Sequence, residues 1–304
     1  MGGAQPQPFS GRDYAALLGV VVIWGVNFVA MKYALRDFTP FQLGAARYVL
    51  AVLPLVLLVK APRLHWKWVV LYGLCQGVGQ FGFLFSALKV GMTAALASVL
   101  MQTQVFFTAI FAFVLLHERP NRPLQIGLGL AALGLGCFAM NYIAPAASTA
   151  TTFWGLVLNL CAAAMWAVSN IVARKAQQEN PHYDALGFVV WGSLVPIVPF
   201  MVFSWLADPP AVRWHWLGAP LSGWLSVAFL GWIATILAYA LWTSLLRRYA
   251  ANRVAPFSLG VPVVGLAAGL FVLGEVVTAW QWAGVTLVVA ALAVVMLGPR
   301  LAAR

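Results

Sequence analysis

Charged side chains are scarce in this sequence: they make up 8% of its 304 residues, and only seven of them are acidic. Soluble domains carry about 25% charged residues, so the scarcity excludes a soluble protein. The 63% of hydrophobic residues and the mean hydropathy of +0.90 indicate many membrane-spanning helices instead. The net charge of +11 would suggest a nucleic-acid partner in a soluble protein. Basic loops of a membrane protein explain it better, and no nucleic acid is expected.

Cysteine and histidine are rare as well. The three cysteines lie inside apolar runs, without the spacing of a disulfide framework or a metal site. The four histidines and the seven acids lie in loops or near the ends of apolar runs, so no nucleophile–base pair, metal triad or carboxylate dyad lies at membrane depth. A retinal-type pump is excluded because no lysine follows Lys175. We expect no enzyme, no cofactor and no metal.

Long apolar stretches are what the chain has instead. A helix needs about 20 apolar residues to cross a bilayer. Ten stretches meet this requirement: 14–35, 40–59, 66–88, 92–116, 123–142, 152–173, 184–206, 222–246, 251–274 and 279–298. The fold class expected is therefore an all-α membrane protein with ten transmembrane helices, and the lipid bilayer is its first partner.

The second half of the chain repeats the first. A shift of 157 positions places Glu118 on Glu275, and the segment around Trp24 is echoed by that around Trp166 at a slightly different offset. A repeat of five spans has an odd number of crossings, so its second copy must be inverted. Inverted halves typically build a carrier with its site near the membrane midplane.

The basic residues of the loops predict the orientation. Thirteen Lys and Arg fall on the side of the two termini and four on the other side, and the excess marks the cytoplasm. We expect a multi-pass protein of the cell (inner) membrane with both termini cytoplasmic. It would have a lead over 1–13, a first five-helix repeat over 14–142, an inverted second repeat over 152–298 and a tail over 299–304.

Polar and aromatic side chains form stripes on some of these spans. Gln76, Gln80 and Phe83 share one face of the third span, and Tyr239 and Trp242 share one face of the eighth. An amide at the midplane costs free energy unless a polar group faces it. These stripes therefore indicate helices that line an interior surface.

Other mid-span residues allow two interpretations each. Gln102 either contacts a substrate or bonds a neighbouring helix, and Gln104, about 100° per residue further round, is not expected to share its role. Trp24 and Trp166 are cavity walls or ordinary packing. A mid-span Asn needs a polar partner. The predicted substrate-binding residues are Trp24, Asn27, Gln76, Gln80, Phe83, Gln102, Trp166, Asn170, Tyr239 and Trp242.

Three charged residues also have both a functional and a structural interpretation. Arg47, about two turns into its span, either pairs with a substrate carboxyl group or has a structural role, in which it snorkels to the outer surface or bonds exposed carbonyls. The structural role is favoured. Glu118 and Glu275 invite a role in proton coupling. Both end their spans near the interface, where solvent and loop groups satisfy them, so the structural interpretation is favoured here too.

The fifth and tenth spans are almost purely apolar. We expect them to face lipid or a partner subunit, in a monomer or a homodimer. The glycines at 127, 129, 134 and 136 in the fifth span indicate close helix packing, because no P-loop lysine accompanies them.

The pattern resembles the EamA-type carriers of the drug/metabolite transporter superfamily, most closely the YddG-type exporters of aromatic amino acids. The resemblance is carried by Trp24 to Phe28 with Lys32, Arg47, Ala94 to Glu118, Trp166 to Lys175, and Pro262 to Gly284. It implies ten helices in two inverted-topology five-helix repeats, around a central cavity lined by helices 1, 3, 4, 6, 8 and 9. Val105 departs from a proline that the family often places there, so no break in the fourth helix is assumed.

These observations together predict a transporter that exports amino acids, aromatic or hydrophobic neutral ones, by alternating access. All seven acids and all four histidines lie at or near the membrane surfaces, so we expect no obligatory ion coupling. A proton-coupled exporter of drugs or other small metabolites is the alternative within the same class. A non-transporting membrane receptor or scaffold is the alternative of another class.

Overall fold

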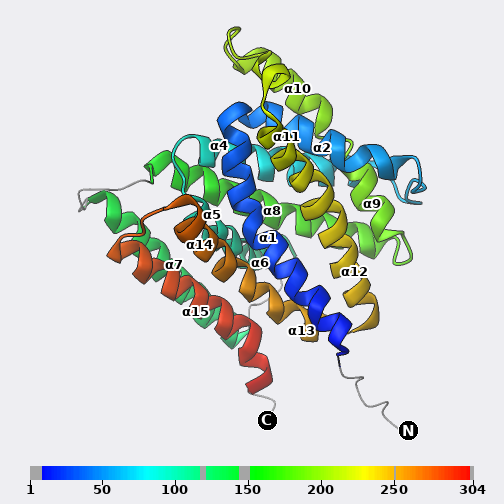
Figure 1. Ribbon diagram of the computed structural model, residues 1–304. Coiled ribbons are helices and arrows are strands. Elements are labelled where there is room, and N and C mark those ends of the chain that lie inside the picture. Colours follow the sequence, from blue (N-terminus) through cyan, green and yellow to red (C-terminus); the bar gives the residue numbers. More distant parts are fainter. Residues whose placement is uncertain (1–8, 117–120, 144–150, 250, 302–304) are drawn as a thin grey trace.

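The computed structural model describes residues 9–116, 121–143, 151–249 and 251–301, and the regular secondary structure within these ranges is all helical (Figure 1). The first half contains α1 (Gly11–Asp37), α2 (Pro40–Val56), α3 (Trp66–Tyr72), η1 (Gly73–Phe81), α4 (Gly82–Lys89), α5 (Ala94–Leu100), η2 (Met101–Thr103), α6 (Gln104–Leu116) and α7 (Arg122–Ile143). The second half contains α8 (Phe153–Glu179), α9 (Ala185–Gly192), α10 (Ile197–Ala207), η3 (His215–Gly218), α11 (Leu221–Ala228), η4 (Phe229–Leu237), α12 (Ala238–Arg248), α13 (Ala251–Val254), η5 (Ala255–Leu259), α14 (Gly260–Leu273) and α15 (Ala279–Leu301).

Each span expected from the sequence coincides with a helical stretch. Nine stretches in the described ranges are long and apolar enough to cross a bilayer, and α2, with 17 residues, is shorter. The protein is thus an all-helical, multi-pass membrane protein. Side-chain caps mark several of the helix starts. Ser10 and Asp13 form a capping box at α1, and Thr39 and Gln42 form another at α2.

Four of the stretches change their helical winding, at matching places in the two halves. The third stretch contains the π-helix η1 and the eighth contains the π-helix η4, each of nine residues. The fourth stretch contains the 3-10 turn η2 and the ninth contains the 3-10 turn η5. No break in the fourth helix was assumed, and the stretch is helical without interruption from Ala94 to Val114. Its winding nevertheless tightens to a 3-10 turn at Met101–Thr103, before Val105 and without a proline. Segments of this kind are frequent at functional sites.

The apolar helices α7 and α15 pack against each other rather than only against lipid. A Cβ added to Gly134 would lie 3.0 Å from Val288, and one added to Gly127 would meet Val295. Residue numbers rise along one helix as they fall along the other, so the two helices are antiparallel. Their outer faces remain open, as Leu133 with 63% exposure shows. The glycine packing expected here is confirmed at 127 and 134, whereas Gly129 and Gly136 face open space.

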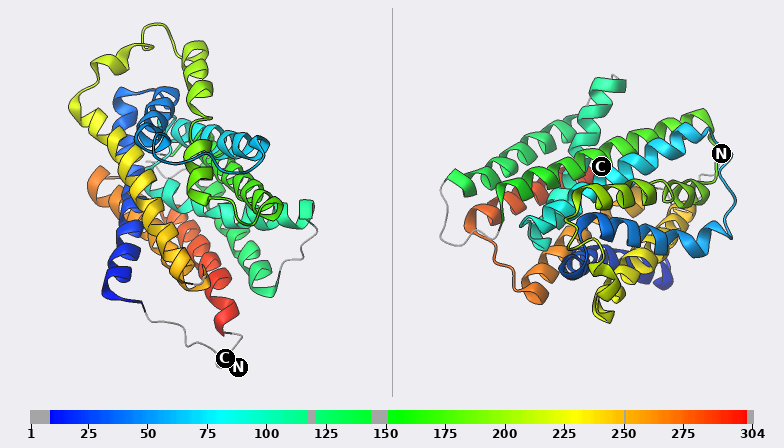
Figure 2. Two further views of the ribbon diagram at one scale, coloured as in Figure 1. Left: turned by 90° about the vertical axis from the view of Figure 1, so that its right-hand side faces the viewer. Right: turned by 90° about the horizontal axis from the view of Figure 1, so that it is seen from above.

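The first and the last described helices begin and end, respectively, on one side of the molecule. The start of α1 and the end of α15 lie on the same side of the molecule, and the connection from α10 to α11 lies on the opposite side (Figures 1 and 2). Helix α1 runs through the middle, packed against α14, α11 and α12. It therefore crosses the fold from one side to the other, and its central residues lie at mid-depth.

Polar contacts tie α1 to its neighbours at both of its ends. At the start, the Asp13 carboxylate accepts from Arg248 Nη1 at 2.5 Å and from the Tyr249 hydroxyl at 2.6 Å. This hydrogen bond to Asp13 raises the pKa of Tyr249, so the phenol keeps its proton. At the far end, Lys32 Nζ donates to the Leu88 carbonyl at 2.9 Å. Between these ties lies a cavity.

Candidate functional site

A cavity of about 310 Å³ lies between the helices at mid-depth of the fold. This is the low end of the roughly 300–1,000 Å³ usual for small-molecule sites. The helices 1, 3, 4, 6, 8 and 9 named by the resemblance all contribute to its lining, and α2 contributes as well. Its residues are Trp24, Asn27, Phe28, Met31, Arg47, Tyr72, Gln76, Gln80, Phe81, Leu84, Ser98, Met101, Gln102, Gln104, Trp166, Asn170, Ala234, Tyr239, Trp242, Ser258 and Val261.

Nine of the ten residues predicted as substrate-binding border this one cavity. Phe83 is the exception, since its side chain is 38% exposed on the outer surface. The reason is the π-helix η1, whose hydrogen bonds run from i to i+5 and whose turns take more residues than the 3.6 of an α-helix. The face that carries Gln76 and Gln80 therefore continues at Leu84, which lines the cavity in place of Phe83.

Amide side chains supply most of the polar lining. Gln76 Oε1 accepts from the Ser169 hydroxyl at 2.5 Å, which ties η1 to α8. Asn27 Oδ1 and Gln80 Oε1 are buried and have no hydrogen-bond partner in the structure. A buried oxygen without a donor is costly to keep, so these two acceptors are features that a bound molecule with N–H groups would satisfy.

Aromatic rings form the apolar part of the wall. Trp24 contacts the ring of Tyr239 at 5.3 Å between centroids and that of Trp242 at 5.4 Å. Its indole Nε1 donates to the Ala234 carbonyl at 3.1 Å, within the π-helix η4. The indole N–H is thereby satisfied, and the ring of Trp24 is held in place as a wall. Trp166, from the corresponding position in the second half, also borders the cavity.

Gln104 was expected to have a role separate from that of Gln102, but both line the cavity. The 3-10 turn η2 takes three residues per turn, which brings positions two apart closer in angle than an α-helix does. Gln104 Oε1 accepts from Asn170 Nδ2 at 2.9 Å, so this amide pair joins α6 to α8. The expectation that a mid-span Asn has a polar partner is confirmed at Asn170, whereas Asn27 Oδ1 has no partner in the structure.

Arg47 is the residue that the sequence interpretation placed wrongly. It does not snorkel to the surface: it is 3% exposed and lines the cavity. Its guanidinium lies 3.9 Å above the centre of the Phe81 ring, and Nη2 donates to the Thr235 hydroxyl at 3.1 Å. The sequence did contain one signal of a buried position, namely a lone arginine well inside an apolar span. The aromatic ring that holds it inward comes from another helix and was not predictable.

Acidic groups are absent from the described lining of the cavity, and so is histidine. Glu275 lies elsewhere, with its two carboxylate oxygens accepting from the backbone N–H groups of Ala94 at 2.7 Å and Ala95 at 2.8 Å. It therefore caps the start of α5, and the groups that satisfy it are backbone N–H groups of another helix rather than the solvent and loop groups expected. Glu118 lies outside the described residues.

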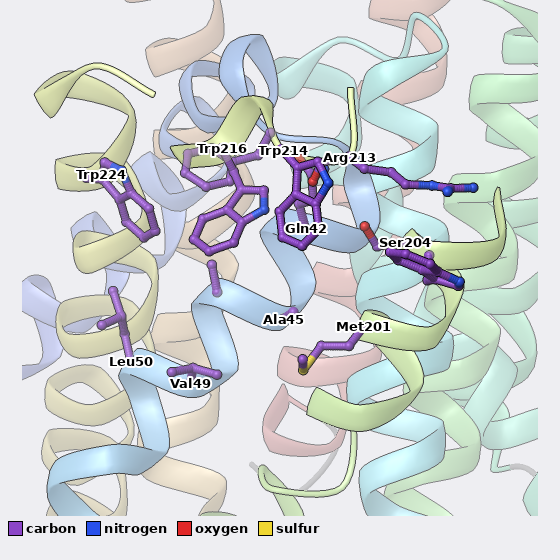
Figure 3. Close-up of a pocket in the computed structure, with 13 residues that line it drawn as sticks. Gln42, Ala45, Val49, Leu50, Met201, Ser204, Arg213, Trp214, Trp216 and Trp224 are labelled. Atoms are coloured by element: carbon purple, nitrogen blue, oxygen red, sulfur yellow. The ribbon is translucent and has the colours of Figure 1, made fainter. Parts of the chain in front are cut away.

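A second pocket, of about 340 Å³, lies apart from the central cavity between α2, α10, η3 and α11 (Figure 3). Its wall is almost entirely apolar, with Trp216 and Trp224 among the rings around it. The Gln42 amide in its wall is already used, because Nε2 donates to the carbonyls of Val212 at 3.0 Å and Arg213 at 3.2 Å. A pocket without free converging polar groups is a poorer candidate for a specific site than the central cavity.

Comparisons with known proteins agree with this geometry. The sequence model of the EamA-like transporter family matches residues 13–140 and again 153–297. A protein of Salmonella typhimurium named "Probable amino-acid metabolite efflux pump" is 38% identical over 96% of this chain and 97% of its own length. The Escherichia coli protein of the same name is 35% identical over the same shares. One solved structure, 19% identical, aligns over 96% of this chain and 99% of its own with a TM-score of 0.61, and supports the fold.

The family match falls on both halves of the chain, and the two efflux proteins cover nearly its full length. The matched family is a family of transporters rather than of enzymes. The chain belongs to the EamA-like transporter family.

Proposed function

We propose that this protein exports neutral amino acids, aromatic or hydrophobic ones, across the cell (inner) membrane by alternating access. The observation that carries the proposal is the convergence of amide groups and indole rings in one cavity at mid-depth. Amides suit the polar ends of an amino acid, and flat rings suit an apolar side chain. The names of the two most similar relatives reported above point to the same class of substrate.

The architecture proposed with this function is ten transmembrane helices in two inverted five-helix repeats, over 14–142 and 152–298. The matched positions of η1 with η4 and of η2 with η5 support the repeat. The antiparallel packing of α7 and α15, the fifth helices of the two halves, supports the inversion. The excess of basic residues on the side of the termini supports their cytoplasmic placement.

The proposed export needs no ion gradient. The described lining of the cavity carries no carboxylate and no imidazole that would bind a proton in one state and release it in another. A zwitterion has no net charge, so its movement across the membrane is independent of the membrane potential. The amino acid then runs down its own gradient, outward when the cytoplasm holds an excess.

The test is exchange by the purified protein in liposomes. Liposomes loaded with unlabelled phenylalanine should take up labelled phenylalanine with no ion gradient imposed, and protein-free liposomes should not. Uptake of cationic drugs that requires a pH gradient, with no amino acid exchange, would support the proton-coupled alternative. Absence of any transport, with a folded protein, would favour a receptor or scaffold.

A further inference from the structure

Arg47 lines the cavity and carries N–H donors that no protein group uses. Its side chain is buried, and Nε and Nη1 have no hydrogen-bond partner. No carboxylate in the described part of the chain forms an ion pair with it. A buried guanidinium without a counter-charge is costly, and Phe81 and Thr235 offset this only in part. Nη2 has a second N–H besides the one given to Thr235, and with Nε or Nη1 it forms a planar fork that matches a carboxylate.

The same cavity contains the complementary groups. Asn27 Oδ1 and Gln80 Oε1 are buried acceptors without a donor, on α1 and on the π-helix η1. Both residues and Arg47 line one continuous space. A residue with unused, positively charged donors and two residues with unused neutral acceptors thus line a common volume, whose other walls include Trp24 and Trp166.

We infer that Arg47 binds the carboxylate of the substrate, while Asn27 and Gln80 accept hydrogen bonds from its ammonium group. This inference rests on the proposed function and specifies how the site recognises its substrate. The backbone of an amino acid fulfils both requirements, whatever its side chain, which is left to the indole walls. A cationic amine without a carboxylate meets the Arg47 charge instead, and the site excludes it by repulsion.

Recognition of the carboxylate and of the ammonium group can be tested on the unmodified protein by a competition series. Exchange of labelled phenylalanine in liposomes is measured against three competitors: phenylalanine, phenylalanine amide and 3-phenylpropionate. The amide lacks the carboxylate and should compete about 100-fold more weakly than phenylalanine. Phenylpropionate lacks the ammonium group and should compete about 10-fold more weakly. An amide that competes within about threefold of phenylalanine would overturn the role of Arg47.

Substitution of Arg47 tests whether this residue recognises the carboxylate. Arg47→Met removes the donors and should weaken phenylalanine binding by about 100-fold, while leaving phenylalanine amide no weaker than in the parent protein. Arg47→Lys keeps the charge without the fork, so its affinity for phenylalanine should lie between those of the parent protein and Arg47→Met. Arg63→Met is the matched control, because Arg63 is an exposed arginine in the connection before α3 and should change nothing. Quenching of tryptophan fluorescence reports binding without transport.

The acceptors are tested in the same way. Asn27→Ala with Gln80→Ala should weaken phenylalanine about 10-fold and leave phenylpropionate unchanged. If the parent protein exchanges no amino acid, the proposed function fails and this inference with it. If the parent exchanges phenylalanine but Arg47→Met still prefers it over its amide, only the inference fails. Should Arg47→Met not fold, the competition series on the parent protein decides.

Discussion

The side-chain amide of Asn170 donates to Oε1 of Gln104 across 2.9 Å. Asn170 belongs to α8, in the second half of the chain, and Gln104 is the first residue of α6, in the first half. The bond lies in the wall of the cavity, directly after the 3-10 turn η2. It therefore joins the two halves at the point where the fourth helix changes its winding.

The Asn170–Gln104 bond should contribute to stability as a coupled pair. Asn170→Ala and Gln104→Ala should each lower the free energy of unfolding by about 1 kcal/mol. The double variant should lose less than the sum by about 0.5–1 kcal/mol, because each single change already breaks the same bond. Denaturant titrations of the four proteins in mixed micelles measure the cycle. Strict additivity would show that the bond carries no stability.

The cavity residues should matter for transport more than for folding. Gln102→Ala removes an amide from the lining, and Trp166→Ala removes an indole wall, so both should lower exchange of labelled phenylalanine about tenfold or more. Membrane abundance should stay near that of the parent protein. Phe83→Ala is the matched control, because Phe83 is on the outer surface. Normal exchange by most cavity variants would place the substrate elsewhere.

The sequence was sufficient for the helical stretches and for nine of the cavity residues, because amides at mid-span and repeat-related tryptophans are visible as a pattern. It could not place Phe83, because nothing in the spacing of its stripe reveals that Gly73–Phe81 winds as a π-helix. It misplaced Arg47, because the Phe81 ring beneath its guanidinium is contributed by a different helix. The winding of η1 decided the position of Phe83, and a contact between distant segments decided that of Arg47. A one-dimensional periodicity contains neither.

Packing of α7 on α15 should distinguish two glycines. A Cβ at Gly284 would lie 2.9 Å from the Gly134 carbonyl oxygen, which is backbone and cannot rotate away. Gly284→Ala should therefore lower the free energy of unfolding by about 1–3 kcal/mol. Gly136 has nothing within 4 Å of such a Cβ, and Gly136→Ala should be neutral or stabilising by about 0.5–1 kcal/mol. Thermal unfolding in detergent compares them, and equal effects would contradict the packing.

Topology is testable by labelling in a background from which Cys75, Cys137 and Cys161 have been removed. Leu217 is 64% exposed in the connection between α10 and α11, so Leu217→Cys should react with a membrane-impermeant maleimide added to whole cells. Arg248→Cys, on the opposite side of the fold, should react only after the cells are opened. We expect this because the excess of Lys and Arg on the side of Arg248 marks that side as cytoplasmic. The reverse pattern would overturn the proposed orientation.

Glu275 should act as a helix cap and not as a proton carrier. Both of its oxygens are occupied by the N–H groups of Ala94 and Ala95, at the positive end of α5. Glu275→Gln keeps one acceptor and loses the charge, so it should lower stability by about 1 kcal/mol. Exchange of phenylalanine should persist in this variant, and neither it nor the parent should require a pH gradient. Exchange that appears only with a pH or sodium gradient, and is lost in Glu275→Gln, would show that Glu275 couples transport to an ion.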